Sequence, residues 1–229
     1  ESLRSLGMTL LKEKRQWRDI KPDEEAALCE AVVAEISKEL QLGEEGDVYE
    51  TVLQQRLEST LKRTVNRLTD WSQKSKFNTR YLEKSFSSYG GAGHWPAVKI
   101  SLGDESYIQL IGQLDRVDEW QDEAGKTYGL VVDYKSGYAE VTASDVYYGL
   151  KLQLVTYLLA LERAQRSDQI EPAALVYTYV KNPRISKSSV LTEEMASELV
   201  KTDTGLKNDG YFTDNVELLA NIDETVVAG

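Results

Sequence analysis

Two apolar segments that each end in charged residues constrain the fold of this chain most strongly. The first runs from Tyr107 to Leu114 and leads into Asp115, and the second runs from Tyr128 to Val132 and leads into Asp133 and Lys135. Uninterrupted apolar runs of this length, bounded by turn residues, are typical of buried strands. Because side chains alternate along a strand, Asp133 and Lys135 are expected on one face and their neighbours on the other.

The stretch between these segments predicts a hairpin. It runs from Asp122 to Lys126 and contains Gly125, which is typical of a tight connection between two strands. The hairpin would bring Asp115 close to Asp133, so that two carboxylates and an ammonium share one site.

Such a site suits cleavage of a phosphodiester bond. Mg²⁺ takes one or two carboxylates together with waters and phosphate oxygens, and it lowers the pKa of a bound water. Lys135 would hold that water or stabilise the charge that develops on the phosphate. The alternative is structural: Asp115 and Asp118 would be turn residues, and Asp133 and Lys135 would lie on the solvated face of an edge strand.

A long helix is predicted from Ser144 to Arg166, with Ser144 or Thr142 as its N-cap. Leucines at helical spacing predict the face that packs on a sheet, and they are Leu150, Leu154, Leu158 and Leu161. Gln153 and Tyr157 are four residues apart and therefore share a face. Such a pair could orient the carboxylates or a phosphate; the alternative is a polar pair on the flank of the helix.

Three motifs occur in order along the chain: Gly-Gln-Leu-Asp-Arg-Val-Asp from Gly112, Asp-Tyr-Lys from Asp133 and Gln-x-x-x-Tyr from Gln153. Together they closely resemble the RecB-type branch of the PD-(D/E)XK nucleases. The sequence around the second and third motifs is most similar to that of the C-terminal nuclease domain of AddB/RexB proteins. The resemblance covers about Tyr81 to Val180. It implies an α/β fold of the restriction-endonuclease type, with a mixed central sheet flanked by helices and an N-terminal helical segment.

The resemblance also implies a role for each motif residue. The catalytic candidates are Lys135, Gln153 and Tyr157, and the metal-binding candidates are Asp115, Asp133, the backbone carbonyl of Tyr134 and Glu83. For Glu83 the alternative is a charge on a strand entering the core. The implied cofactor is Mg²⁺, with Mn²⁺ able to substitute. The implied partners are DNA, as single strands or duplex ends, and the AddA/RexA-like component of a helicase–nuclease that repairs double-strand breaks in the cytoplasm.

Two family features are not matched by the motifs in this sequence. RecB-type nucleases commonly carry a ligand histidine on an upstream helix, in a Gly-x-x-x-His setting, but the single histidine here is His94, in a glycine-rich loop. We therefore expect either that the ligand histidine lies before Glu1 or that this lineage does without it. Many AddB proteins hold an iron–sulfur cluster with four cysteines, whereas Cys29 is the single cysteine here, so no such cluster is expected in this chain.

The net charge of −11 is unfavourable for a DNA-binding protein, but its distribution is uneven. From Thr51 to Lys84 the basic side chains outnumber the acidic ones, and the candidates for DNA binding are Lys62, Arg63, Arg67, Lys74, Lys76 and Arg80. From Ser188 onward the acidic side chains dominate. A basic band beside an acidic metal site fits a guided DNA strand; an ordinary solvated helix face explains it equally well.

The remaining pattern predicts a helical first part, a strand-rich core and an acidic end. Helices are expected over Ser2–Trp17, Pro22–Leu42, Gly46–Trp71 and Thr192–Val200, and strands over Tyr81–Phe86, Val98–Leu102, Tyr107–Val117, Tyr128–Tyr134 and Ala173–Val180. We divide the chain into an N-terminal helical part (1–76), a nuclease core (77–185) and an acidic C-terminal extension (186–229).

The sequence contains no signal peptide, no apolar run long enough to span a membrane and no Gly-x-x-x-x-Gly-Lys-Ser/Thr phosphate loop. A chain that starts at Glu1 is expected to derive from a longer protein, and one cysteine fits a reducing cytosol. The leading hypothesis is a metal-dependent DNA nuclease domain of a helicase–nuclease. The alternatives are a stand-alone RecB-type exonuclease and an inactive nuclease-like domain that binds DNA or a partner protein.

Overall fold

A mixed five-stranded sheet forms the centre of the chain. The computed structural model describes residues 1–40, 48–89, 93–137, 142–164, 170–180 and 209–226. The strands of the central sheet are β1 (Asn78–Phe86), β4 (Gly112–Gln121), β5 (Thr127–Lys135), β6 (Ile170–Tyr179) and β7 (Asp209–Phe212). They lie side by side in the order β1-β4-β5-β6-β7, and only the β5–β6 pair is parallel. Because a parallel neighbour requires a crossover, the helix between β5 and β6 must cover one face of the sheet.

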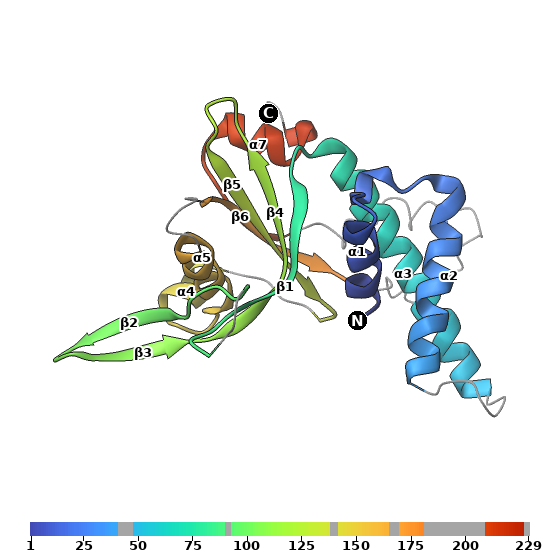
Figure 1. The fold of residues 1–229 in the computed structure, drawn as a ribbon, viewed down its shortest axis with the longest axis horizontal. Coiled ribbons are helices and arrows are strands. Elements are labelled where there is room, and N and C mark those ends of the chain that lie inside the picture. Colours follow the sequence, from blue (N-terminus) through green and yellow to red (C-terminus); the bar gives the residue numbers. More distant parts are fainter. Residues whose placement is uncertain (41–47, 90–92, 138–141, 165–169, 181–208, 227–229) are drawn as a thin grey trace.

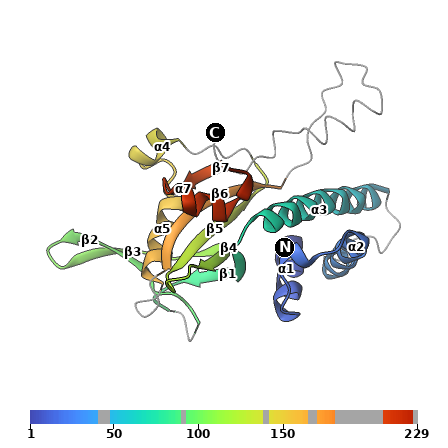
Figure 2. The same ribbon diagram turned by 90° about the horizontal axis from the view of Figure 1, so that it is seen from above.

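Helices cover both faces of this sheet, as predicted (Figures 1 and 2). The helical elements are α1 (Ser2–Lys12), η1 (Trp17–Asp19), α2 (Pro22–Glu39), α3 (Val48–Lys74), α4 (Ala143–Tyr147), α5 (Gln153–Arg163), α7 (Val216–Ile222) and η3 (Glu224–Val226). On one face, Leu154 and Leu161 of α5 pack against Val117 and Val131 of the sheet. On the other face, α7 and the end of α3 cover the alternate strand residues, and α1, α2 and α3 form a core of their own around Trp17. The α/β fold with an N-terminal helical segment is therefore confirmed.

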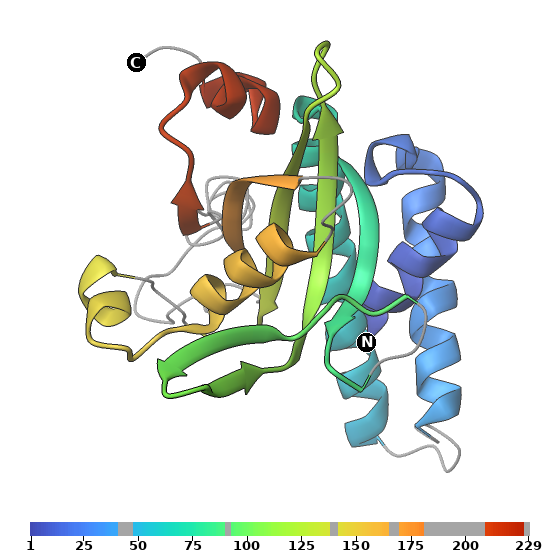
Figure 3. The ribbon, with the colours of Figure 1, turned by 60° about the vertical axis from the view of Figure 1, so that its left-hand side comes forward.

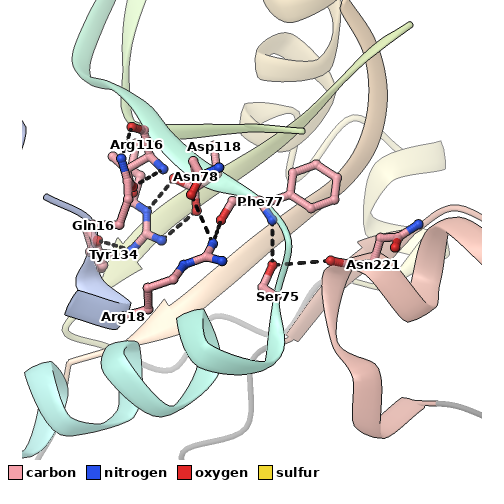
Figure 4. A network of polar contacts seen from close by, with 10 residues as sticks. Gln16, Arg18, Ser75, Phe77, Asn78, Arg116, Asp118, Tyr134 and Asn221 are labelled. Carbon is pink, nitrogen blue, oxygen red and sulfur yellow. Dashed lines mark hydrogen bonds and ion pairs between the residues drawn. The ribbon is translucent and has the colours of Figure 1, made fainter. Parts of the chain in front are cut away.

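Polar contacts join the helical segment to β1 (Figure 4). Arg18 Nη2 donates to the carbonyl of Phe77 at 2.7 Å, and the backbone N–H of Thr79 donates to Gln16 Oε1 at 2.7 Å. Just before the same end of β1, the backbone N–H of Lys76 donates to the carbonyl of Asn221 in α7 at 2.8 Å. The first strand is thus bound to the helices that precede it and to the helix near the end of the chain.

The single strand predicted from Tyr107 to Val117 is wrong, because the chain divides at Ile111. β3 (Ser106–Leu110) pairs with β2 (Val98–Gly103) in a separate two-stranded sheet, whereas β4 enters the central sheet. Figure 3 shows this β2–β3 arm extending from the body beside α5. The side chain of Ile111 is exposed at the division. The sequence on the two sides of Ile111 is similar in character and does not show that the two halves pair with different strands.

The long helix predicted from Ser144 to Arg166 is also wrong. The structure has α4, then a turn, then α5, and Gly149 in the turn has a φ of +71°. A left-handed residue cannot continue a right-handed helix, and glycine adopts that conformation without steric cost. Leu150, the first leucine of the predicted stripe, is exposed, whereas Leu154 and Leu161 are buried.

The other predicted elements differ mainly at their ends. α1 stops at Lys12 instead of Trp17, with Lys14 at a φ of +57°, and β1 starts at Asn78. The hairpin between β4 and β5 is confirmed, and the backbone N–H of Lys126 donates to Asp122 Oδ1 at 2.8 Å within it. The helix predicted over Thr192–Val200 lies outside the described residues.

The division into three parts stays a prediction. β7 and α7 fall in the proposed acidic extension, yet β7 pairs with β6 and α7 packs on the sheet. None of the helices in the described ranges combines the length and the apolar character needed to cross a membrane.

Candidate active site

Asp133 and Lys135 lie near the end of β5, on the face that α5 covers. The side chain of Asp133 is 2% exposed, and its Oδ2 atom lies 2.7 Å from Lys135 Nζ. The Lys135 ammonium also lies over the ring of Tyr177, 5.0 Å from the ring centroid. Tyr177 is the partner of Asp133 in the parallel β5–β6 pairing. The alternation of the strand therefore places the carboxylate and the ammonium on one face, beside an aromatic ring from the next strand.

Gln153, the first residue of α5, joins this pair to the helix. Its Oε1 atom accepts a hydrogen bond from Lys135 Nζ at 2.8 Å, and its Nε2 atom donates to Asp133 Oδ1 at 3.1 Å. Nε2 also donates to the hydroxyl of Tyr157 at 2.8 Å. The amide thus presents its acceptor to the cation and its donor to the anion, which fixes the orientation of both. Burial raises the pKa of Tyr157, so its hydroxyl stays protonated.

Asp115 reaches the same site from β4, through an irregularity in the sheet. The regular β4–β5 pairing ends at Arg116 and Val132, and beyond it the backbone N–H of Tyr134 donates to Asp115 Oδ2 at 2.9 Å. The carboxylate thus replaces a backbone carbonyl as the partner of a strand N–H group. It satisfies that N–H group and holds the Asp115 side chain between the two strands.

Glu83 lies on β1 at the level of Asp115, in a second irregularity. Its φ is +51°, a conformation that non-glycine residues rarely adopt and that is concentrated at functional sites. Gln113 Nε2 donates to Glu83 Oε2 at 2.7 Å and to its backbone carbonyl at 3.0 Å. The strained residue is therefore held by β4.

A pocket of about 360 Å³ opens next to these residues. Its walls include Glu83, Asp115, Tyr134 and Ser136 from the sheet, together with the first residues of α1 and part of α3. The Asp133–Lys135–Gln153–Tyr157 cluster is not part of its lining. Asp115 thus lines the pocket and also lies near enough to Asp133 for its charge to act on that carboxylate.

The carboxylates of Asp115 and Asp133 fit a divalent metal ion that needs few protein ligands. Burial raises the pKa of Asp133, and the nearby Asp115 charge raises it further, while Lys135 opposes the shift. A carboxylate whose charge is disfavoured by burial and by a second carboxylate forms a site where a cation is stabilising. The described residues contain no group of three or more His, Cys, Asp and Glu side chains suited to a metal ion. Mg²⁺ is compatible with two carboxylates, because it retains waters and takes substrate phosphate oxygens.

Arg116 and Asp118 form a buried ion pair on the opposite face of β4, which sequence reasoning did not identify. Arg116 Nε donates to Asp118 Oδ1 at 2.7 Å and Nη2 donates to Oδ2 at 2.5 Å, so the contact is bidentate (Figure 4). Arg116 Nη1 also donates to the hydroxyl of Tyr134 at 3.3 Å. Burial alone would lower the pKa of Arg116, but Asp118 and Tyr134 outweigh it and the pKa is raised. The spacing of Arg116 and Asp118, two residues apart on a strand, was the available signal for a shared face.

Gly112, which opens the first motif, lies against an aromatic ring. A Cβ atom at this position would lie 2.7 Å from Phe86 Cζ and 3.0 Å from Cε1. Phe86 is fully buried and packs edge-on against Tyr157. Glycine thus lets β4 approach the ring that supports Tyr157.

The predicted DNA-binding residues lie at different distances from this site. Lys62 contacts Glu58 at 2.6 Å and Glu30 at 3.0 Å, which compensates its charge. Arg67 lies closer to the site, because its Nη1 donates at 3.0 Å to the carbonyl of Tyr179, the sheet partner of Lys135. Lys76 lies over Trp120, at the end of the sheet opposite to Lys135. That end lies roughly 23 Å from Lys135, because Tyr128, the partner of Trp120, precedes Lys135 by seven strand residues.

The other predicted basic residues are scattered in the same way. Arg63 is half-buried in α3, whereas Lys74 and Arg80 are exposed near the end of α3 and the start of β1. The role of all six in binding DNA stays a prediction. His94 is exposed, and the next residue, Trp95, is buried beside Phe86.

Comparison with known proteins identifies the family of this fold and motif set. The family model described as the PD-(D/E)XK nuclease superfamily matches residues 9–227. The chain belongs to this superfamily. Its relatives include the B subunit of the ATP-dependent helicase/deoxyribonuclease of Alkaliphilus metalliredigens, which is 31% identical over 99% of this chain. The corresponding protein of Bacillus mycoides is 29% identical over the whole chain. In both comparisons the chain spans 20% of the length of the relative.

Proposed function

We propose that this chain is the metal-dependent nuclease domain of a bacterial ATP-dependent helicase–nuclease, and that it hydrolyses phosphodiester bonds of unwound single strands. The observation that carries the proposal is the joining of Asp133, Lys135 and Gln153 by hydrogen bonds and an ion pair, with Asp115 held beside them. Membership of a nuclease superfamily and similarity to components of helicase/deoxyribonucleases support it.

Asp115, Asp133 and the backbone carbonyl of Tyr134 would hold Mg²⁺ or Mn²⁺, with Glu83 as a further ligand beside the pocket. When bound, the ion supplies a polarised phosphoryl oxygen and a water of lowered pKa. Lys135 would donate hydrogen bonds to the attacking water or to the phosphoryl oxygen on which charge develops. Gln153 would hold the Lys135 ammonium at the required position.

The proposal also includes the cellular process and the partner protein of this chain. The chain would act in double-strand break repair in the cytoplasm, together with an AddA/RexA-like protein that contributes motor activity. The stand-alone exonuclease has less support, because the matched relatives extend well beyond the matched region.

The test is cleavage of end-labelled single-stranded DNA in Mg²⁺ or Mn²⁺, with Mn²⁺ binding measured by calorimetry on the same samples. We expect Asp133→Ala and Lys135→Ala to abolish cleavage and Asp133→Ala to weaken Mn²⁺ binding. Gln153→Ala should reduce cleavage about 10- to 100-fold, the usual effect of removing a group that orients metal ligands. Lys126→Ala is the matched control, since this exposed lysine pairs with Glu171 far from the site.

A folded protein that neither binds Mn²⁺ nor cleaves DNA would contradict the proposal. The inactive nuclease-like binding domain would then be the better description.

A further inference from the structure

Two exposed tyrosines lie on the element that leads into the candidate active site. Tyr147 ends α4 and is 84% exposed, and Tyr148 follows it and is 71% exposed. Their rings contact each other edge-to-face, with centroids 5.2 Å apart and an interplanar angle of 86°. Neither ring belongs to any of the three hydrophobic clusters formed by the described residues. Core packing therefore does not explain this pair of rings.

The backbone that carries the rings is well supported. The Thr142 hydroxyl accepts a hydrogen bond from the backbone N–H of Asp145 at 3.1 Å, and Lys151 Nζ lies 3.2 Å from Asp145 Oδ2. The backbone N–H group of Gly149 donates to the carbonyl of Val146 at 3.0 Å, and that of Leu150 donates to the carbonyl of Asp145 at 2.8 Å. Both rings are thus carried by a hydrogen-bonded turn, and an ordered backbone lowers the entropy cost of binding a ligand to them.

The turn also places the rings near the catalytic candidates. Five residues after Tyr148 the chain reaches Gln153, which contacts both Asp133 and Lys135. Five residues span at most about 18 Å. Since stacked nucleotides advance about 3.4 Å along a strand, this separation corresponds to a few nucleotides. Figures 2 and 3 show α4 standing out from the body of the molecule, with α5 connecting it to the sheet.

We propose that Tyr147 and Tyr148 form a base-stacking platform that holds single-stranded DNA next to the Asp133–Lys135 site. This inference rests on the proposed nuclease function and names the residues that would hold its single-stranded substrate. Every base offers a π-face, so the platform is tolerant of sequence. In a duplex those faces are covered by neighbouring bases, so the rings favour an unpaired strand. The Lys151–Asp145 pair is internally compensated, so the platform selects by stacking and not by net charge.

The experiment measures binding of fluorescent single strands by anisotropy in EDTA, so that no strand is cleaved. One strand is a thymidine oligonucleotide, and the other is an abasic strand of the same length and charge. The unsubstituted chain is compared with a Tyr147→Ala/Tyr148→Ala double variant and with a Tyr147→Phe/Tyr148→Phe double variant that keeps both rings. Thermal melting of all three checks that substitution at these exposed positions leaves the fold intact.

We expect the alanine variant to bind the thymidine strand about tenfold more weakly, which corresponds to about 1.4 kcal/mol. The phenylalanine variant should stay within about twofold of the unsubstituted chain, because stacking needs the ring and not the hydroxyl. Both variants should bind the abasic strand as the unsubstituted chain does. Equal losses on the two strands, no loss on the thymidine strand, or no binding of that strand by the unsubstituted chain would each overturn the platform. An unaffected thymidine strand would leave the rings as a contact for a protein partner.

This test is separable from the test of the nuclease. In one outcome the chain cleaves DNA, Lys135→Ala does not, and the Tyr147→Ala/Tyr148→Ala variant binds thymidine strands normally. The platform is then refuted and the nuclease stands. If no cleavage occurs but base-dependent binding is lost in the alanine double variant and kept in the phenylalanine double variant, the nuclease is refuted and the platform stands.

Discussion

Replacing Asp118 by asparagine should destabilise the fold strongly, because the change leaves the Arg116 charge buried without its counter-ion. Both side chains are 3% exposed, and two hydrogen bonds of 2.7 and 2.5 Å join them. After the substitution the guanidinium would keep the Tyr134 hydroxyl and the rings of Trp17 and Trp71, at 5.4 and 5.9 Å from their centroids. Removing one partner of a buried pair typically costs about 3–5 kcal/mol.

The assay is thermal unfolding followed by circular dichroism. In a chain of this size, 1 kcal/mol shifts the Tm by about 2–4 °C, so Asp118→Asn should lower the Tm by roughly 6–20 °C. The matched control is Glu171→Gln, which removes one charge from the exposed Lys126–Glu171 pair. Solvent-screened surface ion pairs contribute little to the free energy of unfolding, so the Tm of the control should equal that of the unsubstituted chain.

A third variant tests whether the loss of stability comes from the unpaired Arg116 charge or from changed packing. Arg116→Met combined with Asp118→Leu removes both charges while keeping apolar volume, and it should recover most of the lost stability. A Tm of Asp118→Asn equal to that of Glu171→Gln would refute the cost assigned to the unpaired Arg116 charge. So would a double variant that is as unstable as Asp118→Asn.

Two further changes test burial and close packing. Burial raises the pKa of Cys29 to about 11, so at pH 8 its thiol stays protonated and should react with a thiol reagent only after unfolding in guanidinium; fast labelling of the native chain would contradict this. Gly112→Ala should lower stability by about 1–3 kcal/mol, because the new methyl group would overlap the Phe86 ring. Gly137→Ala is its control, since a Cβ atom there meets nothing within 4 Å, and equal melting of the two variants would refute the argument.

The strand alternation was enough to predict that Asp133 and Lys135 share a face, because β5 is regular and both of its faces are covered by apolar side chains. The position of Asp115 was predicted only in part. Its carboxylate reaches the site by binding the backbone N–H of Tyr134, in place of a regular ladder contact. Irregularities of this kind depend on two strands at once, so the sequence of one strand does not reveal them.

Tertiary contacts also determine which basic side chains of α3 keep an uncompensated charge that could bind DNA. The basic residues of α3 looked like a continuous band, but Lys62 is compensated by Glu30 from a different helix. Glu30 is 32 residues away in the sequence, which local charge counting does not consider. The division of the predicted long helix had a clear local signal in Gly149, whereas the separation of β3 from β4 at Ile111 had none.

The burial of β5 on both faces restricts how this strand can change during evolution. Asp133 and Lys135 point to the α5 side, whereas Leu130, Val132 and Tyr134 point to the opposite core. Insertion or deletion of one residue within the strand would exchange the two faces for every position beyond it. The carboxylate and the ammonium would then enter an apolar core, and the fold and the site would be lost together. We therefore expect length variation among relatives in the β4–β5 turn and the β2–β3 arm, and none within β5.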